Sequence, residues 1–305
     1  MLSQEKEPTP YYPEQGHNIC EDAVYSLLPE GLEPCDARVL FVHAHPDDES
    51  TFTGATMGLL ADSGAQVDLV TMTRGELGEV IPRELKHLEV GQPQCTDGGQ
   101  ALGEYRSGEL SEAIQSLGVH EHLFLGEGVS AGKETPAIFY DSGMVWGADG
   151  RPEANPQASQ ECLTRTSLDI QVQALMRVIK HYRPHVVVTY DAGGGYGHPD
   201  HVRTHEVSLE AVKNLGGTAD APCLLWGLEG DYSSEDNRVQ AVIDGSVARK
   251  REAMAAHRTQ VIIASEDSYQ FSNLVVQKIS ARETYRLIWS APTATVVSAS
   301  QEKKR

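Results

Sequence analysis

The chain has 305 residues, 40% of them hydrophobic, and its 44 acidic and 25 basic residues give a formal net charge of −19. This length and composition predict a large buried core and exclude a fully disordered chain, while the negative charge argues against polyanionic partners such as nucleic acids and anionic membranes. The sequence shows neither the charged-then-apolar order of a secretory leader nor an apolar run of about eighteen residues, which predicts a cytoplasmic protein.

The first segment, residues 1–36, is rich in Pro, Glu and Gln and has no sustained periodicity. We expect it to be an extension that lies on the surface or frays. The texture of the sequence changes at Ala37, where apolar runs begin. Residues 37–300 are therefore expected to form a single domain, and the charged tail at 301–305 is expected to be mobile.

A βαβ unit is predicted at the start of this domain. Residues 39–42 form a continuous apolar run, which is typical of a strand buried on both faces. Residues 50–63 are predicted to form a helix that ends at Gly64, and residues 67–72 a second strand. Such a unit normally crosses over right-handed, so the two strands are expected to be parallel.

Helices and strands continue to alternate along the chain. The spacing of apolar residues predicts helices over 100–117, 168–182, about 198–214 and 246–256. Short apolar runs predict strands over 122–125, 185–190 and 223–228. This order is typical of an α/β, Rossmann-like fold, in which a mostly parallel sheet is flanked by helices and ligands bind at the carboxyl ends of the strands. The pattern is weaker after Asp244, which indicates a smaller C-terminal region.

The segment 126–159 is dense in Gly, Pro and Asp. It is too long for a structureless connection inside a compact domain unless it has a binding role. We therefore expect it to form part of the wall of the functional site.

Polar side chains follow the first strand in the run His43-Ala44-His45-Pro46-Asp47-Asp48-Glu49. Packing does not require two imidazoles and three carboxylates at a strand end. A turn rich in Asp and Pro can also serve a loop or a helix cap, and His45 taken alone is more often a structural residue than a ligand. A second group of polar residues is therefore needed before a catalytic or metal-binding role is favoured over a structural one.

That second cluster is the run YDAGGGYGHPDH, from Tyr190 to His201, which also follows an apolar strand. The two turns are expected to meet at one edge of the sheet, where His45, Asp48 and His201 would form a metal site with open coordination positions. Zinc, Fe(II), Mn(II) and Co(II) all suit such ligands. The five cysteines are scattered and lack a CxxC pair, so we expect reduced thiols and no thiolate site.

Further residues beside these ligands are candidates for catalysis. Asp47 is placed to act as the base that accepts a proton from the attacking water. His198 can face the site without binding the metal, with Asp200 holding its ring. A protonated His198 would then stabilise an oxyanion or protonate the leaving amine. The glycines at 193–197 alone are weak evidence for phosphate binding, because they lack the spacing of a dinucleotide motif.

At these two segments the sequence resembles the zinc-dependent N-acetylglucosaminyl deacetylase family, the LmbE-like proteins, which includes glucosaminylphosphatidylinositol deacetylases and bacterial thiol-biosynthesis deacetylases. The motifs AHPDDE and GHPDH carry this resemblance. Four further segments look like the actinobacterial mycothiol branch: TMTRGELGEV at 71–80, LGEYRSGEL at 102–110, YDSGM at 140–144 and AMAAHRTQ at 253–260. The resemblance covers most of the chain from about residue 37 to 260 and implies an LmbE-like deacetylase fold.

The resemblance also implies roles for the matching residues. The metal ligands would be His45, Asp48 and His201, holding one Zn²⁺ per subunit, with Fe²⁺ as the alternative ion. The catalytic residues would be Asp47 as the base, His198 for the oxyanion, Tyr196 beside it, and Asp200. The substrate-binding candidates are Arg106, Asp141, Met144 and Glu79. Without the resemblance, Arg106 would equally fit a surface cation, and His257 is expected to be a structural or rim residue.

The implied reaction is the metal-dependent hydrolysis of the N-acetyl group of 1-O-(2-acetamido-2-deoxy-glucopyranosyl)-myo-inositol in mycothiol biosynthesis. The alternatives are a mycothiol S-conjugate amidase and a deacetylase of another N-acetylglucosamine-containing substrate. The amidase carries a lysine shortly after its HPDDES motif, whereas this chain has Ser50-Thr51-Phe52-Thr53, which favours the deacetylase.

A different class of function is also considered, namely an α/β protein that binds a ligand or has a structural role and has lost catalysis. The intact set of histidines and aspartates argues against this alternative. The expected partner is a small amino sugar, and the oligomeric state is left open.

Overall fold

The structure is a computed structural model that describes residues 20, 23–148, 150–230 and 238–296. The strands of its main sheet are β1 (Arg38–His43), β2 (Gln66–Thr71), β3 (Glu121–Phe124), β6 (Val186–Tyr190), β7 (Leu224–Leu228), β8 (Gln240–Asp244) and β12 (Arg282–Ser290). They lie in the order β3-β2-β1-β6-β7-β12-β8, and all neighbours from β3 to β7 are parallel. The expected α/β fold with a mostly parallel sheet is confirmed.

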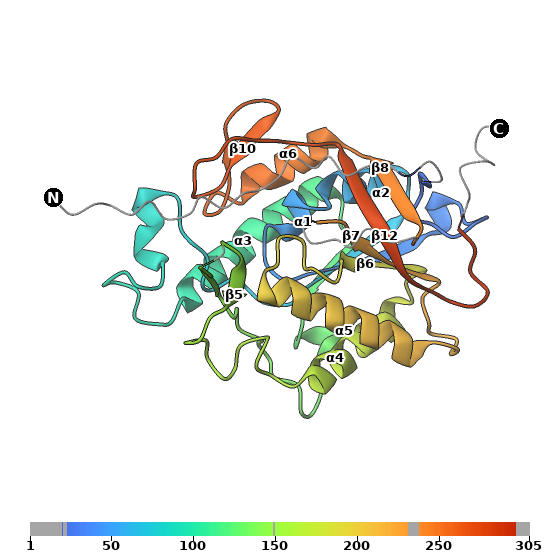
Figure 1. Cartoon of the computed structure of the whole chain (residues 1–305), viewed down its shortest axis with the longest axis horizontal. Helices are drawn as coiled ribbons and strands as arrows, with labels where there is room; N and C mark the ends of the chain where they lie inside the picture. Colours follow the sequence, from blue (N-terminus) through green and yellow to red (C-terminus); the bar gives the residue numbers. More distant parts are fainter. Residues whose placement is uncertain (1–19, 21–22, 149, 231–237, 297–305) are drawn as a thin grey trace.

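Helices cover both faces of this sheet (Figure 1). They are α1 (Asp48–Thr51), α2 (Gly54–Asp62), α3 (Gln100–Leu117), α4 (Leu168–Tyr182), α5 (Pro199–Leu215) and α6 (Val247–Ala256). Neighbouring side chains of a strand point to opposite faces, which divides the core into two layers. Phe41 packs in the layer that contains residues of α2, α3 and α6, whereas Leu40 and Val42 pack in the layer with α4 and α5.

The predicted helices over 100–117 and 168–182 are confirmed residue for residue as α3 and α4. α3 ends because Gly118 adopts a left-handed conformation with φ 74°, and its N–H bonds back to the last turn. The predicted single helix over 50–63 is wrong, since α1 and α2 are separate. Thr53 leaves the helical region at φ −124°, and its hydroxyl lies 2.7 Å from Nε2 of His43.

The C-terminal region contributes more to the main sheet than the sequence pattern indicates. Strand β12 inserts between β7 and β8 and is antiparallel to both. A separate small sheet contains β9 (Ile262–Ile263), β10 (Ser268–Gln270) and β11 (Gln277–Lys278). Short elements lie elsewhere: β4 (Met144–Trp146), β5 (Pro152–Ala154) and the 3-10 helices Pro34–Asp36, Arg83–Leu88 and Gly128–Ser130.

Residues 1–36 were expected to lie on the surface, and in the described part of this segment side chains such as Tyr25 and Glu30 are exposed, but four apolar side chains are not. Ala23, Val24, Leu27 and Leu28 are buried. Val24 pairs with Ala241 of β8, and the indole Nε1 of Trp226 donates a hydrogen bond to the carbonyl oxygen of Leu27 at 2.9 Å. These apolar side chains close the layer of the core that contains Phe41. Residues 1–19 and the predicted mobile tail at 301–305 lie outside the described residues.

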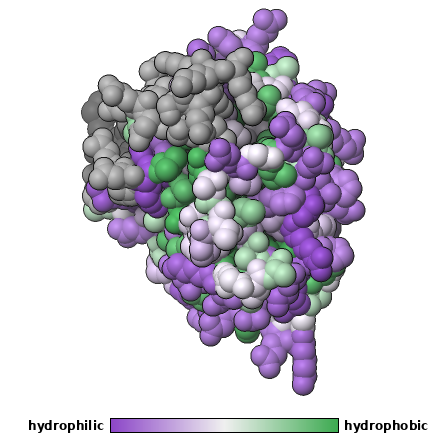
Figure 2. Space-filling view, turned by 90° about the vertical axis from the view of Figure 1, so that its right-hand side faces the viewer, coloured by the Kyte–Doolittle hydropathy of each residue, from purple (hydrophilic) through white to green (hydrophobic). Residues whose placement is uncertain are grey.

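The surface is mainly polar, in agreement with the high net charge. On the face shown in Figure 2, hydrophilic residues surround smaller hydrophobic areas. Among the residues that the structure describes, none of the helices combines the length and the apolar character needed to cross a lipid bilayer.

Candidate active site

The two polar turns meet because β1 and β6 are neighbours in the sheet. Val39, Leu40 and Phe41 pair in parallel with Val186, Val187 and Val188. Both strands therefore release the chain at the same edge, which is where ligands bind in open parallel sheets. His45 lies in the turn between β1 and α1, and His201 lies in the first turn of α5.

Three donor atoms at this edge form a nearly equilateral triangle. His45 Nδ1 lies 3.3 Å from Asp48 Oδ2 and 3.3 Å from His201 Nε2, and the last two atoms are 3.4 Å apart. Two ligands bound at about 2.05 Å and separated by a tetrahedral angle lie about 3.3 Å from one another. The triangle therefore fits one face of a tetrahedral metal site, and its three side chains are all buried.

The hydrogen bonds of both imidazoles leave the correct nitrogen free for a metal. His45 Nε2 donates to Asp200 Oδ2 at 3.3 Å, and His201 Nδ1 donates to the carbonyl oxygen of Gly194 at 3.2 Å. In each neutral ring the nitrogen that faces the triangle is then unprotonated and carries a lone pair. Partners of this kind fix the tautomer and the orientation of metal-binding histidines.

Two other groups around His45 also bring donor atoms within 4.8 Å of one another: His45 with His198 and His201, and His45 with Asp141 and Asp200. We favour the triangle with Asp48 for two reasons. Its atoms are closer and more regular, and the second group would require a metal on the nitrogen of His45 that carries the proton. These groups show that the described residues could hold a metal ion, and they do not identify the ion.

Asp47 directly precedes Asp48 in the turn after β1 and is not one of the three donors of the triangle. Its Oδ1 accepts a hydrogen bond from the guanidinium of Arg106 at 3.1 Å. Burial raises the pKa of Asp47 to about 7, because desolvation of the carboxylate outweighs the opposing effect of the Arg106 charge. A carboxylate with this pKa suits a general base that works near neutral pH.

His198 caps α5 and lies beside both histidine ligands. Its ring centroid is 4.7 Å from that of His45 and 5.0 Å from that of His201. Burial, together with these two rings, lowers the pKa of His198 well below its usual range. The prediction of a protonated His198 is therefore wrong: the ring is neutral, and its Nδ1 accepts the backbone N–H of Asp200 at 3.1 Å, so that Nε2 carries the proton.

The prediction that Asp200 holds the ring of His198 is also wrong. The carboxylate of Asp200 instead accepts hydrogen bonds from His45 Nε2 and from the backbone N–H of Ser142 at 2.9 Å. Asp200 lies two residues after His198 at the start of α5, so the two side chains point to different sides of the helix, and that of Asp200 faces Ser142. The carboxylate of Asp200 thus orients the ring of His45, and only the backbone of Asp200 bonds to His198.

The loop that the sequence predicts to wall the site does reach it. Asp141 Oδ1 lies 3.7 Å from His45 Nε2, and Asp141 Oδ2 accepts the backbone N–H of Leu77 at 3.2 Å. Burial raises the pKa of Asp141, but its interactions with the His45 ring and with the backbone N–H of Gly143 outweigh this effect and hold the pKa far below the usual range. Asp141 is therefore an anion that faces the same imidazole as Asp200.

The other substrate-binding candidates, Arg106, Met144 and Glu79, differ in how deeply they are buried. Arg106 is buried and donates to the carbonyl oxygens of Gly75 and Pro46 as well as to Asp47, so the surface-cation alternative is wrong. Met144 is half-buried in β4, and Glu79 is exposed. Neither of these two side chains is brought into contact with the metal-type donors.

Two aromatic rings, those of Tyr196 and Phe52, lie beside His201. Tyr196 is half-buried and lies edge-on to His201, with a centroid distance of 5.2 Å. Phe52, which follows α1, stacks on Tyr196 at 6.4 Å and lies 5.8 Å from His201. The two rings form a wall beside the metal-type donors, which fits an uncharged ligand better than an ionic one.

Several functional contacts come from residues that the sequence analysis did not single out. The hydroxyl of Tyr190 donates to Asp48 Oδ2 at 2.7 Å, and its ring stacks on His201 with a centroid distance of 4.2 Å. Glu49 and His257 form a buried pair beside Asp47. The position of Tyr190 at the end of an apolar strand was the available signal, since a tyrosine hydroxyl buried there needs a partner.

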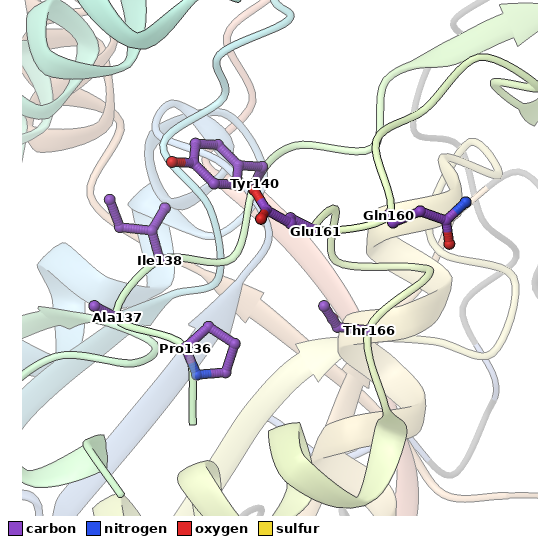
Figure 3. Close-up of a pocket in the computed structure, with 7 residues that line it drawn as sticks. All are labelled: Pro136, Ala137, Ile138, Tyr140, Gln160, Glu161 and Thr166. Carbon is purple, nitrogen blue, oxygen red and sulfur yellow. The ribbon is translucent and has the colours of Figure 1, made fainter. Parts of the chain in front are cut away.

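A pocket of about 380 Å³ has none of these donors in its lining, and Figure 3 shows the residues that line it. It is lined by Pro136, Ala137, Ile138, Tyr140, Gln160, Glu161 and Thr166. The lining is mostly apolar and includes one carboxylate and no imidazole. It therefore lacks the paired groups that hydrolysis requires, and we assign the chemistry to the triangle.

Comparison with known proteins gives a family and close relatives. Residues 40–212 match the family model described as GlcNAc-PI de-N-acetylase. The chain is 38% identical over 293 residues to the 1D-myo-inositol 2-acetamido-2-deoxy-alpha-D-glucopyranoside deacetylase of Kineococcus radiotolerans, with 82% of this chain and 77% of the relative covered. It is 36% identical over 308 residues to the protein of the same name from Thermomonospora curvata, with 89% and 96% covered.

Two solved structures with a similar fold are named as deacetylases. A zinc-inhibited form of teicoplanin deacetylase is similar with a TM-score of 0.55 and 17% identity, covering 84% of this chain and all of that one. The N,N'-diacetylchitobiose deacetylase of Pyrococcus horikoshii is similar with a TM-score of 0.50 and 20% identity, covering 73% of this chain and 70% of that one. At these identities the likeness establishes the fold alone.

Proposed function

The chain belongs to the GlcNAc-PI de-N-acetylase family, and we propose that it is the deacetylase of 1-O-(2-acetamido-2-deoxy-glucopyranosyl)-myo-inositol in mycothiol biosynthesis. The products are glucosaminyl-inositol and acetate. The single observation that carries the chemistry is the triangle of His45, Asp48 and His201, with Asp47 and His198 beside it. The names of the relatives support the choice of substrate.

We propose that the triangle holds one Zn²⁺ ion per subunit. Two imidazole nitrogens and one carboxylate oxygen are typical ligands of catalytic zinc, and Fe²⁺ accepts the same set. When bound, the cation supplies Lewis acidity, which polarises the acetyl carbonyl and makes water acidic enough to be deprotonated near neutral pH. The three ligands occupy one side of the ion and leave the other side for water and substrate.

Asp47 is the proposed base. Its carboxylate accepts a proton as the oxygen of water attacks the acetyl carbon, and it then returns this proton to the nitrogen of the sugar as the C–N bond breaks. The overall result is one water consumed, one acetate and one free amine formed. Arg106 holds Oδ1 of Asp47, which leaves Oδ2 to face the water.

His198 is the proposed donor to the acetyl oxygen. Because its Nδ1 accepts the N–H of Asp200, the proton of the neutral ring is on Nε2. This N–H stabilises the negative charge that builds up on the carbonyl oxygen, and a fixed neutral donor can do so without a net charge. Tyr196 is proposed to contact the same part of the substrate from the aromatic wall.

The contacts to the sugar and inositol hydroxyls are proposed to involve Asp141, Arg106, Met144 and Glu79. Asp141 is the best placed of the four, because its carboxylate is negatively charged and its Oδ1 lies 3.7 Å from His45 Nε2. Arg106 acts mainly through Asp47, since its guanidinium is already bonded to three oxygens. Met144 and Glu79 are further out, where the inositol ring would lie.

The function is tested by release of a primary amine from a panel of N-acetylated sugars. The enzyme should be fastest on N-acetylglucosaminyl-inositol and slower on N-acetylglucosamine alone. A bimane-labelled mycothiol conjugate serves as the competing substrate, because the S-conjugate amidase alternative predicts faster cleavage of that amide. Higher kcat/KM on the conjugate would replace the deacetylase proposal by the amidase.

A further inference from the structure

The backbone of Asp47 is in a conformation that few residues adopt. Asp47 has φ 109° and ψ −26°, and it is one of three non-glycine residues with positive φ among those that the structure describes. Such a conformation costs about 1–3 kcal/mol and persists only where the surroundings impose it. The contacts that hold this peptide unit are therefore part of how the base is positioned.

Glu49 supplies one of these contacts. Its Oε2 accepts the backbone N–H of Asp47 at 3.0 Å, and its Oε1 accepts the hydroxyl of Ser50 at 2.5 Å. The Glu49 carboxylate is completely buried, and its pKa is lowered because the charge of His257 and these hydrogen bonds outweigh the cost of burial. Glu49 is thus a buried anion that bonds directly to the backbone of the proposed base.

His257 supports Glu49 from a distant part of the chain. It follows the last residue of α6, and its Nε2 donates to Glu49 Oε1 at 2.6 Å. Both side chains are 0% exposed. The His257 Nδ1 atom has no hydrogen-bond partner within the described part of the chain. A buried pair that leaves one polar atom unsatisfied gives little stability compared with apolar packing, so its presence favours a positioning role.

The side chain of Asp47 is held from the opposite direction. Arg106 of α3 bonds to its Oδ1, and also to the carbonyl oxygen of Pro46 in the preceding peptide unit. α3 and α6 pack against each other, so the two helices place Arg106 and His257 on either side of the turn. The backbone and the carboxylate of Asp47 are therefore fixed by separate groups.

We propose that Glu49 and His257 are positioning residues, which hold Asp47 in its left-handed conformation and so aim its carboxylate at the attacking water. This inference rests on the proposed function, in which Asp47 is the base. A displacement of a reacting group by about 1 Å can lower a rate about 100-fold. Loss of the pair should therefore lower kcat and leave KM and metal binding unchanged.

The test compares two replacements of His257 that have similar size. His257→Leu removes the donor to Glu49, whereas His257→Gln keeps a donor in the position of Nε2. We expect a loss in kcat of about 10- to 100-fold for His257→Leu, and recovery of most of this loss in His257→Gln. Metal content and KM should match the unmodified enzyme in both.

Thr259→Val is the matched control. Thr259 lies two residues beyond His257, is equally buried, and donates its hydroxyl to Glu109 Oε2 at 2.6 Å. This variant also loses one buried hydrogen bond to a carboxylate but does not touch Asp47. A purely structural role for His257 predicts the same kcat for His257→Leu and Thr259→Val, and that result would overturn the proposal.

A double-variant cycle separates this inference from the proposed function. If the pair acts through Asp47, His257→Leu causes no further loss of residual activity in the Asp47→Ala background. An equal loss in both backgrounds overturns the positioning role. Full activity of Asp47→Ala alone would instead contradict the proposal that Asp47 is the base.

If His257→Leu does not fold, Glu49→Gln replaces it as the test variant. A loss in kcat at unchanged KM and metal content supports the proposal, and an unchanged kcat overturns it.

Discussion

The hydroxyl of Tyr190 donates a hydrogen bond to Asp48 Oδ2 at 2.7 Å, and it accepts the backbone N–H of Ala44 at 2.9 Å. The same ring lies parallel to His201, with an interplanar angle of 7°. One residue of β6 thus fixes a carboxylate from the β1 turn and an imidazole from α5. This residue therefore joins the two turns directly.

Tyr190→Phe should weaken metal binding while the fold is kept. The substitution removes the donor to Asp48 but retains the ring that stacks on His201. Loss of such an outer partner typically lowers metal affinity about 10- to 100-fold. Competition with a chromophoric chelator measures the dissociation constant. Tyr269→Phe, whose hydroxyl bonds to Gln277 in the small sheet, is the control and should bind metal normally. Equal affinities of the two variants would show that Tyr190 does not support the site.

Asp47→Ala should lower turnover strongly, to a small residual activity, and leave the metal in place. General-base catalysis contributes about 10²- to 10⁴-fold, so kcat should fall within or beyond this range. Metal stoichiometry, measured on the purified protein, should stay near that of the unmodified enzyme. Loss of the metal in Asp47→Ala would make Asp47 a ligand rather than the base.

Arg106→Gln should shift the pH profile of the enzyme. Burial raises the pKa of Asp47 to about 7 even though the positive charge of Arg106 opposes this shift. Without this charge the pKa of Asp47 rises, so the carboxylate is protonated at higher pH and the acid limb of kcat/KM moves upward. Arg106→Lys keeps the charge and should shift the limb less. An acid limb that moves to lower pH, or that is identical in both variants, would contradict the ion pair.

Leu27→Ala should destabilise the protein, although its sequence context indicates a surface segment. Leu27 is 2% exposed and belongs to the same core layer as Trp226. Replacing a buried leucine with alanine costs about 2–5 kcal/mol in the free energy of unfolding, measured by urea denaturation. Val276→Ala, at a side chain that is 61% exposed, is the control with an expected change within about 0.5 kcal/mol. A similar small effect at Leu27 would contradict the buried position.

The parts of the site that were predictable from sequence are those that follow directly from strand ends. His45 and Asp48 follow β1, His201 lies at the start of the helix that follows β6, and parallel strands bring their carboxyl ends to one edge. The topology therefore places these residues together without any knowledge of side-chain geometry. The same reasoning predicted most of the parallel strands, because a strand buried on both faces gives a continuous apolar run.

The remaining contacts depend on packing that a local pattern does not contain. Glu49 and His257 are 208 residues apart, and either residue alone fits a solvated surface. The neutral state of His198 depends on its burial beside two other imidazoles. Leu27 and Leu28 lie in a segment rich in Pro and Glu, so their few apolar side chains gave no periodic signal. Each of these features is decided by tertiary contacts rather than by spacing.

The central claim is that one cation binds at the triangle of His45, Asp48 and His201. Anomalous diffraction from crystals of the zinc-loaded protein, recorded on both sides of the zinc absorption edge, tests it most directly. We predict one strong peak at about 2.0–2.2 Å from His45 Nδ1, Asp48 Oδ2 and His201 Nε2. A peak between His45 Nε2, Asp141 and Asp200 in its place, or no peak at this edge of the sheet, would contradict the account.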